Sequence, residues 1–304
     1  MADILVIGSL NADLVVRAPR FPKAGETISG EDLQILPGGK GANQAVAAAR
    51  QGVKTAMVGR VGNDSFGPFL LNSLKSDAVD ITNVLVHDSA TGTATIIVDS
   101  NGQNSIVLSA GANGKVSIRD IDSLTVDAKI LLLQLEIPLE TVIHAAKWGK
   151  EKGMTVVLNP APARALPDEL ISNADFILPN ETELNSLTGV PVRDLASAEQ
   201  AARKLLKRGA QHVIVTLGEN GALAVTREQV IQSNSYKVSV VDTTAAGDAF
   251  IGGFASALLR GLELKEAVKY SNACGALAAT KFGAQPSLPN KEETEEFMSL
   301  RGGA

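Results

Sequence analysis

Short runs of aliphatic and β-branched residues alternate along most of this chain with longer, alanine-rich stretches. Residues 4–7 are apolar at every position, which is typical of a strand covered on both faces of its sheet. The repeated order of strand and helix predicts an α/β fold: a parallel, doubly wound sheet flanked by helices. The predicted strands are 4–7, 55–58, 130–133, 155–158, 176–178 and 212–216. The predicted helices are 42–50, 66–74, 139–150, 181–187, 197–207, 247–260, 264–280 and a charged helix after Pro289, and a hairpin-like stretch surrounds residues 220–221.

Two segments depart from this alternation. Residues 13–36 hold prolines and glycines among short alternating runs. Residues 93–98 and 105–108 are two β-branched runs joined through Asn101-Gly102, a pair that strongly favours a hairpin. We expect both segments to pair into a small sheet that stands off the main domain.

Composition and charge narrow the class of protein. The chain has 304 residues, of which 45% are hydrophobic and 20% charged, as in ordinary globular proteins. Its formal charge of -5 argues against a nucleic-acid partner, because such proteins carry a basic face. No signal peptide or run of ~20 apolar residues is recognisable, so we expect a soluble cytoplasmic protein without a membrane partner. The single cysteine, Cys274, excludes an intrachain disulfide and is expected to be a buried, inert thiol.

A glycine-rich segment, residues 37–44, opens the first predicted helix. Its glycines allow a close approach to a ligand, and the helix start offers unpaired N–H groups. A Walker-type phosphate loop is excluded, because Lys40 precedes Gly41 and position 34 holds Gln34 in place of glycine. Lys40 and Asn43 at this helix start suit a polyhydroxy ligand whose buried hydroxyls need partners. A glycine turn that only opens the helix remains the alternative.

A second segment, residues 242–248, places an acidic residue at the mouth of a helix among very small residues. The N–H groups of Ala245, Ala246 and Gly247 are uncovered by side chains and favour an anion. A carboxylate beside such a site can deprotonate a hydroxyl while the amides stabilise a transferring phosphoryl group. We therefore predict Asp248 as a general base, against the alternative that it only stabilises the helix dipole.

Other polar positions are less specific. Residues 179–183 follow a predicted strand and are equally explained by a helix N-cap at Asn180. Residues 216–221 are equally explained as a β-turn. The three histidines show no ligand spacing, which argues against structural zinc, and no Gly-x-Gly-x-x-Gly follows the first strand, which disfavours a dinucleotide enzyme.

Taken in order, these motifs resemble those of the ribokinase family, the PfkB-type carbohydrate kinases, over essentially the whole chain. The resemblance implies a single ribokinase-like domain, residues 1–304, with a discontinuous β lid formed by about 12–37 and 91–110 that also mediates a homodimer. The implied reaction is ATP-dependent phosphorylation of D-ribose at its 5-hydroxyl. A sister kinase for deoxyribose, a ketohexose or a nucleoside, and a sugar sensor without activity, are the alternatives. The motifs are 8–13, 21–27, 38–45, 134–138, 158–163, 179–183, 242–248 and 283–287.

The resemblance also assigns roles to single positions. Asp248 would be the base, assisted by Ala245, Ala246 and Gly247, and Glu183 would hold Mg²⁺ through water. The sugar would be bound by Asn11, Asp13, Gly39, Lys40, Asn43, Glu136 and Asp248. The residues bordering ATP would be Asn180, Thr216, Gly218, Glu219, Gly221, Gly247 and Asn272. A K⁺ activator would be held by Asp242, Thr244, Ala278, Lys281, Gly283 and Ser287, in part through backbone carbonyls.

Overall fold

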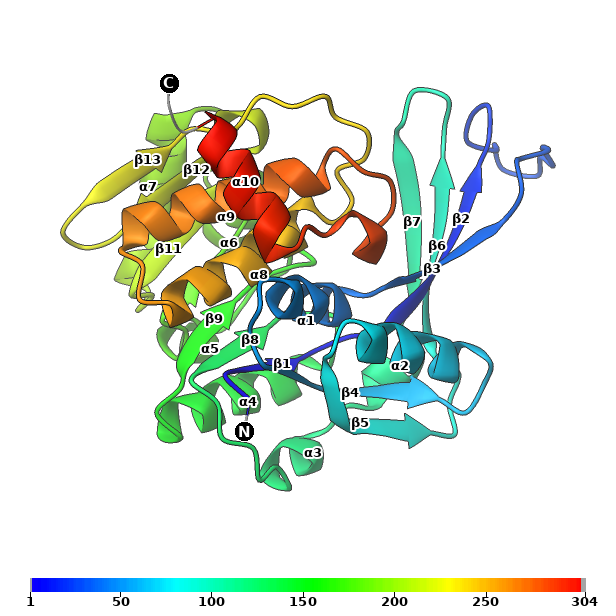
Figure 1. The fold of residues 1–304 in the computed structure, drawn as a ribbon, viewed down its shortest axis with the longest axis horizontal. Coiled ribbons are helices and arrows are strands. Elements are labelled where there is room, and N and C mark those ends of the chain that lie inside the picture. Colours follow the sequence, from blue (N-terminus) through cyan, green and yellow to red (C-terminus); the bar gives the residue numbers. More distant parts are fainter. Residues whose placement is uncertain (1, 302–304) are drawn as a thin grey trace.

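A nine-stranded sheet forms the centre of the main body (Figure 1). The computed structural model describes residues 2–301. The sheet has the order β13-β12-β11-β10-β9-β8-β1-β4-β5, and all strands from β11 to β5 run parallel. β12 and β13 are antiparallel additions at one edge. The strands are β1 Ile4–Ile7, β4 Thr55–Gly62, β5 Asp80–His87, β8 Ile130–Leu133, β9 Thr155–Leu158, β10 Phe176–Ile177, β11 His212–Thr216, β12 Ala222–Val225 and β13 Val230–Ser233.

Helices cover both faces of this sheet because successive strand residues point to opposite sides. Leu5 and Ile7 of β1 pack into one buried cluster, with α4 to α7. Ile4 and Val6 pack into the other, with α1, α2, α8 and α9. The helices on the first face are α3 Ile118–Asp122, α4 Leu139–Glu151, α5 Asp168–Ser172, α6 Glu181–Thr188 and α7 Leu195–Lys207. The helices on the second face are α1 Lys40–Arg50, α2 Phe66–Ser76, α8 Ala246–Leu259, α9 Leu264–Ala278 and α10 Lys291–Arg301.

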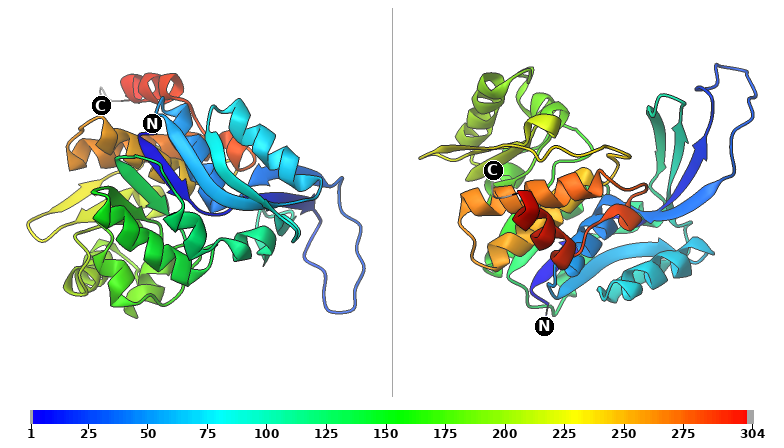
Figure 2. Two further views of the ribbon diagram at one scale, coloured as in Figure 1. Left: turned by 90° about the horizontal axis from the view of Figure 1, so that it is seen from below. Right: turned by 45° about the horizontal axis from the view of Figure 1, so that its top comes forward.

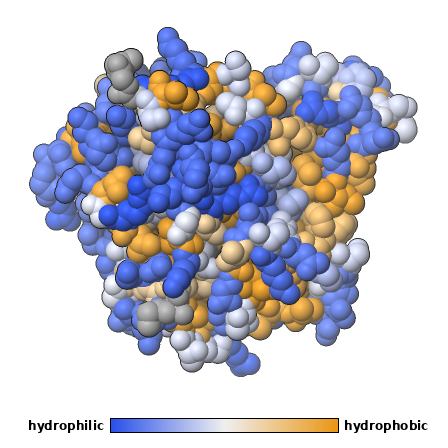
Figure 3. Space-filling model, in the orientation of Figure 1, coloured by the Kyte–Doolittle hydropathy of each residue, from blue (hydrophilic) through white to orange (hydrophobic). Residues whose placement is uncertain are grey.

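A small four-stranded sheet projects from the main body, as two further views confirm (Figure 2). Its order is β3-β2-β6-β7; β2 and β6 are parallel, and the outer pairs are antiparallel. Its core holds only Val15, Ala94 and Ile96, with a few partly buried neighbours. Apolar residues lie uncovered on its surface, visible over β6 and β7 in Figure 3, and Val107 is 65% exposed. The strands are β2 Asn11–Arg17, β3 Gln34–Gly38, β6 Gly92–Val98 and β7 Asn104–Ser109.

The sequence-based fold class is confirmed, and the two irregular segments do pair into a separate sheet. The elements that the sequence pattern missed include β5, α3, α5 and β13. β5 contains Asp80 and Asn83 and lies at the sheet edge, half exposed, so it lacks the continuous apolar run of a central strand. No helix within residues 2–301 is long and apolar enough to cross a membrane.

Candidate active site

The sugar-binding residues predicted from the sequence meet where β1, β8 and the start of α1 come together. Glu136 follows β8, and its Oε2 accepts hydrogen bonds from the Ser9 hydroxyl at 2.5 Å and from the Lys40 backbone N–H at 3.1 Å. The Asn11 amide lies 3.5 Å from the same oxygen. Ser9 lies in the motif 8–13 but had no predicted role of its own. These contacts fix the Glu136 carboxylate at the carboxyl end of the parallel strands, where α/β sheets bind ligands.

Glycine is required at this junction. Gly39 has φ +91°, and a Cβ there would lie 2.7 Å from the backbone nitrogen of Asn11. A Cβ on Gly41 would lie 2.5 Å from the nitrogen of Ser9. The glycines thus allow the start of α1 to pack against Ser9 and Asn11, which follow β1. This close packing places the Lys40 backbone N–H beside Glu136.

A second buried side chain, which was not predicted from the sequence, holds Asn11 in place through a hydrogen bond. Asn113, in the short 3₁₀ helix Gly111–Lys115, donates from Nδ2 to Asn11 Oδ1 at 2.7 Å and to the Leu10 carbonyl at 3.0 Å. Its Oδ1 accepts from the Leu10 N–H at 2.9 Å. Because residues 111–115 follow the small sheet and Leu10 precedes it, Asn113 ties the two connections together.

Charge is concentrated around Lys40. Burial, together with Glu136 and Asp248, raises the pKa of Asp13 to about 7, although Lys40 acts in the opposite direction. Burial alone would lower the pKa of Lys40, but the surrounding carboxylates outweigh it, so that pKa is raised. Burial also raises the pKa of Glu183. Within residues 2–301, no group donates a hydrogen bond to the buried Asp13 carboxylate, so this group has capacity for a ligand.

Asp248 lies in the first turn of α8 and is 5% exposed. Its Oδ2 accepts from Asn43 Nδ2 at 3.0 Å, and its Oδ1 accepts from Gln44 Nε2 at 3.0 Å. The other side-chain atom of Asn43, Oδ1, is buried and has no partner among the residues that the structure describes. The predicted base and the predicted sugar residue Asn43 are therefore in direct contact. No role was predicted for Gln44, because a glutamine inside an alanine-rich helix forms no recognisable pattern of its own.

The start of α8 has free donors beside this carboxylate. The Ala246 N–H donates to the Thr243 carbonyl at 3.2 Å, a turn contact that occupies one of the amides predicted for the anion hole. The Gly247 and Asp248 N–H groups have no acceptor within the described chain. A Cβ at Gly247 would have no atom within 4 Å, so the space in front of these amides is open. Two adjacent free amides at a helix N-terminus favour an anion.

The residues predicted for ATP lie along the carboxyl ends of β10 and β11. Asn180 caps α6, accepting from the Glu183 N–H at 2.8 Å, while Glu183 accepts from the Asn180 N–H at 2.9 Å. The N-cap interpretation of this motif is therefore correct, and it leaves Glu183 buried near Lys40. Asn180 also bridges Thr216 of β11. Gly218 and Glu219 lie in the exposed turn Gly218–Asn220 that follows β11, and Gly221 closes that turn.

Asn272 on α9 has a packing role in this structure. Its Nδ2 donates to the Ser233 carbonyl at 3.1 Å, the Ser233 hydroxyl at 3.0 Å and the Asn234 carbonyl at 3.2 Å. These contacts anchor the end of β13. The amide nitrogen of Asn272 is consequently committed to the protein.

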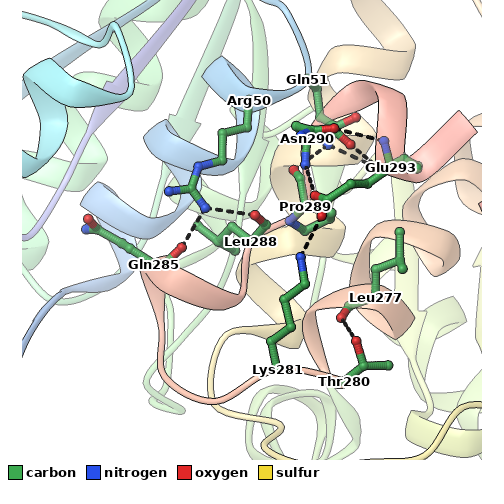
Figure 4. A network of polar contacts seen from close by, with 11 residues as sticks. Arg50, Gln51, Leu277, Thr280, Lys281, Gln285, Leu288, Pro289, Asn290 and Glu293 are labelled. Carbon is green, nitrogen blue, oxygen red and sulfur yellow. Dashed lines mark hydrogen bonds and ion pairs between the residues drawn. The ribbon is translucent and has the colours of Figure 1, made fainter.

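The residues predicted for K⁺ fall into two groups. Asp242 Oδ1 accepts from the Thr244 hydroxyl at 2.5 Å, and its Oδ2 accepts from the Gly283 N–H at 2.9 Å, so these three lie together. Lys281 turns away, and its Nζ contacts Glu293 Oε1 of α10 at 2.7 Å (Figure 4). The Ser287 hydroxyl donates to the Ala284 carbonyl at 2.8 Å, and Ala278 is buried at the end of α9.

Glu183 is a carboxylate of this site that the sequence predicts for a divalent ion. No group of three or more His, Cys, Asp or Glu side chains suited to a metal exists in the described part of the chain. Mg²⁺ fits such a site, because it keeps several waters and is commonly bound through one or two carboxylates and substrate phosphates.

A profile of the pfkB family of carbohydrate kinases matches residues 1–291. The chain is 44% identical to a ribokinase of Haemophilus influenzae over 97% of this chain and 98% of that protein. It is 43% identical to a deoxyribokinase of Salmonella typhi over 98% and 99% of the two chains. A solved structure of Arabidopsis thaliana ribokinase, complexed with ribose and ATP, is 36% identical, with a TM-score of 0.89 and 98% of each chain covered. This chain therefore belongs to the pfkB family of carbohydrate kinases.

Proposed function

We propose that this chain is an ATP-dependent kinase that transfers the γ-phosphoryl group of ATP to the 5-hydroxyl of D-ribose. The observation that carries the proposal is the Asp248 carboxylate, buried and held by Asn43 and Gln44 beside the free amides of Gly247 and Asp248. A fixed carboxylate next to an anion site is the arrangement that phosphoryl transfer to a hydroxyl requires.

Two of the groups that hold the sugar, Asp13 and Asn43 Oδ1, lack partners within residues 2–301. The Asp13 carboxylate accepts sugar hydroxyls, and Asn43 Oδ1, buried and unpartnered, accepts another. Glu136 and Lys40 supply an acceptor and a donor on the main-body side, and Asn11 supplies an amide from the small sheet. A buried group built to pair with a hydroxyl rejects a ligand that lacks it, which gives the site selectivity for polyhydroxy compounds.

The reaction needs one proton and one phosphoryl group to move. Asp248 accepts the proton of the 5-hydroxyl as the oxygen attacks the γ-phosphorus, and the bond from that phosphorus to the ADP oxygen breaks. The Gly247 and Asp248 amides, with Ala245 and Ala246 shaping the turn, stabilise the charge on the transferring group. Asn180, Thr216, Gly218, Glu219 and Gly221 border the nucleotide on the other side, while Asn272 supports the adjacent β13.

Two cations complete the proposal. Glu183, whose raised pKa comes from burial and is also affected by the nearby charges of Lys40 and Asp248, would hold Mg²⁺ through water. Asp242 and Thr244, with carbonyls of residues such as Ala278, Lys281 and Gly283 and with Ser287 nearby, hold K⁺. Mg²⁺ when bound neutralises phosphate charge, and K⁺ supplies a fixed positive charge near the start of α8.

Deoxyribose is the second candidate substrate, because a deoxyribokinase matches this chain as well as the ribokinases do. The deciding experiment is a panel of ribose, deoxyribose, a ketohexose and a nucleoside, assayed with ATP and Mg²⁺ in the presence and absence of K⁺. We expect the highest kcat/KM for ribose, and a fall in kcat without K⁺. A higher kcat/KM for deoxyribose reassigns the substrate, and failure to phosphorylate any sugar contradicts the proposal.

The small sheet acts as a lid in this proposal and forms a homodimer contact. Ile106, Val107 and Leu108 of β7 are exposed, which is costly for a surface in water and typical of an interface. We expect Val107→Lys to convert a dimer into a monomer in sedimentation equilibrium, and ATP hydrolysis without sugar to be much slower than phosphorylation of ribose. A wild-type monomer contradicts the dimer. The enzyme is expected to work in the cytoplasm, where ATP is available.

A further inference from the structure

Behind Asp248, three buried amide side chains form a continuous hydrogen-bonded chain. Gln44 Nε2 donates to Asp248 Oδ1 at 3.0 Å and to Asn159 Oδ1 at 3.1 Å. Gln134 Nε2 donates to Gln44 Oε1 at 2.7 Å. Gln44 and Gln134 are fully buried and Asn159 is 6% exposed, so Gln44 and Gln134 contact neither solvent nor a ligand in the site.

The direction of this chain is fixed by a backbone carbonyl, which can only accept. Asn159 Nδ2 donates to the Leu178 carbonyl at 3.1 Å, so Asn159 Oδ1 must face Gln44. Gln44 then has to present its nitrogen to Asn159, and the same nitrogen reaches Asp248. Gln134 reinforces this orientation by donating to the Gln44 oxygen. A rotated Gln44 amide would place its oxygen against both Asn159 Oδ1 and the Asp248 carboxylate.

Space for this arrangement is reserved by a glycine after β1. A Cβ at Gly8 would lie 2.0 Å from Gln134 Oε1 and 2.9 Å from the Cα of Gly41. Gln134 Oε1 itself has no partner in the described chain. When Gln134 Nε2 donates to Gln44, the Gln134 Oε1 atom is left buried without a partner. Such an oxygen lowers the free energy of unfolding.

We propose that Gln44 is a positioning residue for the general base, oriented by Asn159 and Gln134. The proposal rests on the proposed function, since it assumes that Asp248 takes the proton. Gln44 holds one carboxylate oxygen while Asn43 holds the other, and together they fix the plane of the carboxylate.

The test compares a glutamine inside α1 with the glutamine directly after its C-terminal end. Gln44→Leu removes the donor to Asp248, and Gln51→Leu is the matched control. Gln51 is also buried, and its Nε2 donates to the Pro289 carbonyl at 2.9 Å (Figure 4). Its Oε1 accepts from the Tyr270 hydroxyl at 2.6 Å. Both substitutions leave buried polar partners unsatisfied, so both should lower the melting temperature. Only Gln44 contacts the base.

For Gln44→Leu we expect kcat to fall about tenfold to a hundredfold, with KM for the sugar changed by less than about threefold. The acidic limb of the kcat/KM profile should move to higher pH, because the charged carboxylate loses a donor. Gln51→Leu should keep the wild-type kcat and pH profile. Wild-type kcat in Gln44→Leu, an unshifted acidic limb, or an equal loss of kcat in Gln51→Leu overturns the proposal.

Gln134→Leu keeps the test decisive if Gln44→Leu does not fold. It removes only the donor that orients Gln44, and we expect a smaller loss of kcat with the same direction of shift in the acidic limb. Asp248→Asn tests the assignment of the base independently of the positioning role of Gln44. If Asp248→Asn is inactive while both glutamine variants behave as wild type, the positioning role fails and the proposed function stands. If Asp248→Asn is active, the base assignment itself fails.

Discussion

The two ends of α1 carry buried polar networks that differ in one respect. At its C-terminal end, Arg50 donates from Nε to Asp77 at 2.6 Å. Its Nη1 donates to the carbonyls of Gln285 and Leu288 at 2.7 and 2.8 Å (Figure 4). These groups are paired within the protein. At its N-terminal end, Asp13 receives no donor and Asn43 Oδ1 has no partner among residues 2–301.

This difference distinguishes polar groups that stabilise the fold from polar groups that are free to bind a ligand. A buried polar group that finds its partner inside the chain holds the fold together, and its loss lowers stability. One that lacks a partner is a cost to the fold, and a ligand can relieve that cost. The paired end of α1 should therefore respond to mutation mainly in stability, and the unpaired end mainly in binding and turnover.

The largest effect is expected at the base. Asp248→Asn keeps the shape of the side chain but removes the proton acceptor, so kcat should fall about 10²- to 10⁴-fold. Sugar binding, measured by calorimetry, should remain, because Asp13, Lys40 and Glu136 keep their side chains. Turnover near that of the wild type would show that the unpaired end of α1 does not face the reacting hydroxyl.

A smaller effect on binding, with a characteristic pH dependence, is expected at Asp13. Because folding raises the Asp13 pKa to about 7, this group favours the folded state at low pH, and that contribution is lost as pH rises from about 4 through 7. Asp13→Asn should therefore raise the melting temperature of the sugar-free enzyme at pH 8 more than at pH 5. It should also raise KM for the sugar about tenfold or more through loss of a charged acceptor.

Sugar affinity provides the matching measurement on the wild-type enzyme. Hydroxyl donors favour the ionised Asp13 carboxylate, so binding should release protons near pH 7 and be tighter at pH 8 than at pH 6. In Asp13→Asn this part of the pH dependence should disappear. The same pH dependence in both proteins would assign it to another group of the cluster.

At the paired end, the expected change is in stability. Arg50→Met leaves the Asp77 carboxylate and two carbonyls without their donor, and we expect the free energy of unfolding to fall by about 3 kcal/mol. Urea denaturation measures this loss, and KM for the sugar measured on the folded enzyme should be unchanged. A large rise in KM without loss of stability would contradict the division between the two ends.

The smallest effect is expected at Tyr270. Tyr270→Phe removes the hydroxyl that donates to Gln51 Oε1 at 2.6 Å, and the free energy of unfolding should fall by about 1 kcal/mol. Activity should be that of the wild type. If kcat fell as well, the two ends of α1 would be coupled, and the comparison would need a shared mechanism.

The main fold could be predicted because its strands follow a simple pattern. β1, β8, β9 and β11 each contain a buried run of consecutive apolar residues, and their bounds match the sequence prediction. β5 could not be found this way, since an edge strand alternates with polar residues that solvent accepts. The hairpin of β6 and β7 was predictable because Asn101-Gly102 specifies the turn.

The candidate site was predictable only where residue type and local context coincide. Asp248 among alanine and glycine, and Lys40 among glycines, form local patterns that indicate chemistry. Gln44 and Asn113 lie in ordinary contexts, and their importance comes from partners about a hundred or more positions away. Such long-range hydrogen bonds leave no trace in local sequence, so these residues emerge only from the fold.

The register of β2 has a consequence for how this enzyme can change. Asn11 and Asp13 lie on the small sheet, where Asn11 pairs with Gly38 and Gly92, whereas Asp248 belongs to α8 of the main body. Two of the residues proposed to bind the sugar thus lie on the small sheet, and the residue proposed to deprotonate it lies in the main body. Substitutions in the small sheet can alter which hydroxyls are recognised while the phosphoryl-transfer machinery remains intact. This division would allow the sugar specificity to change through variants that remain active.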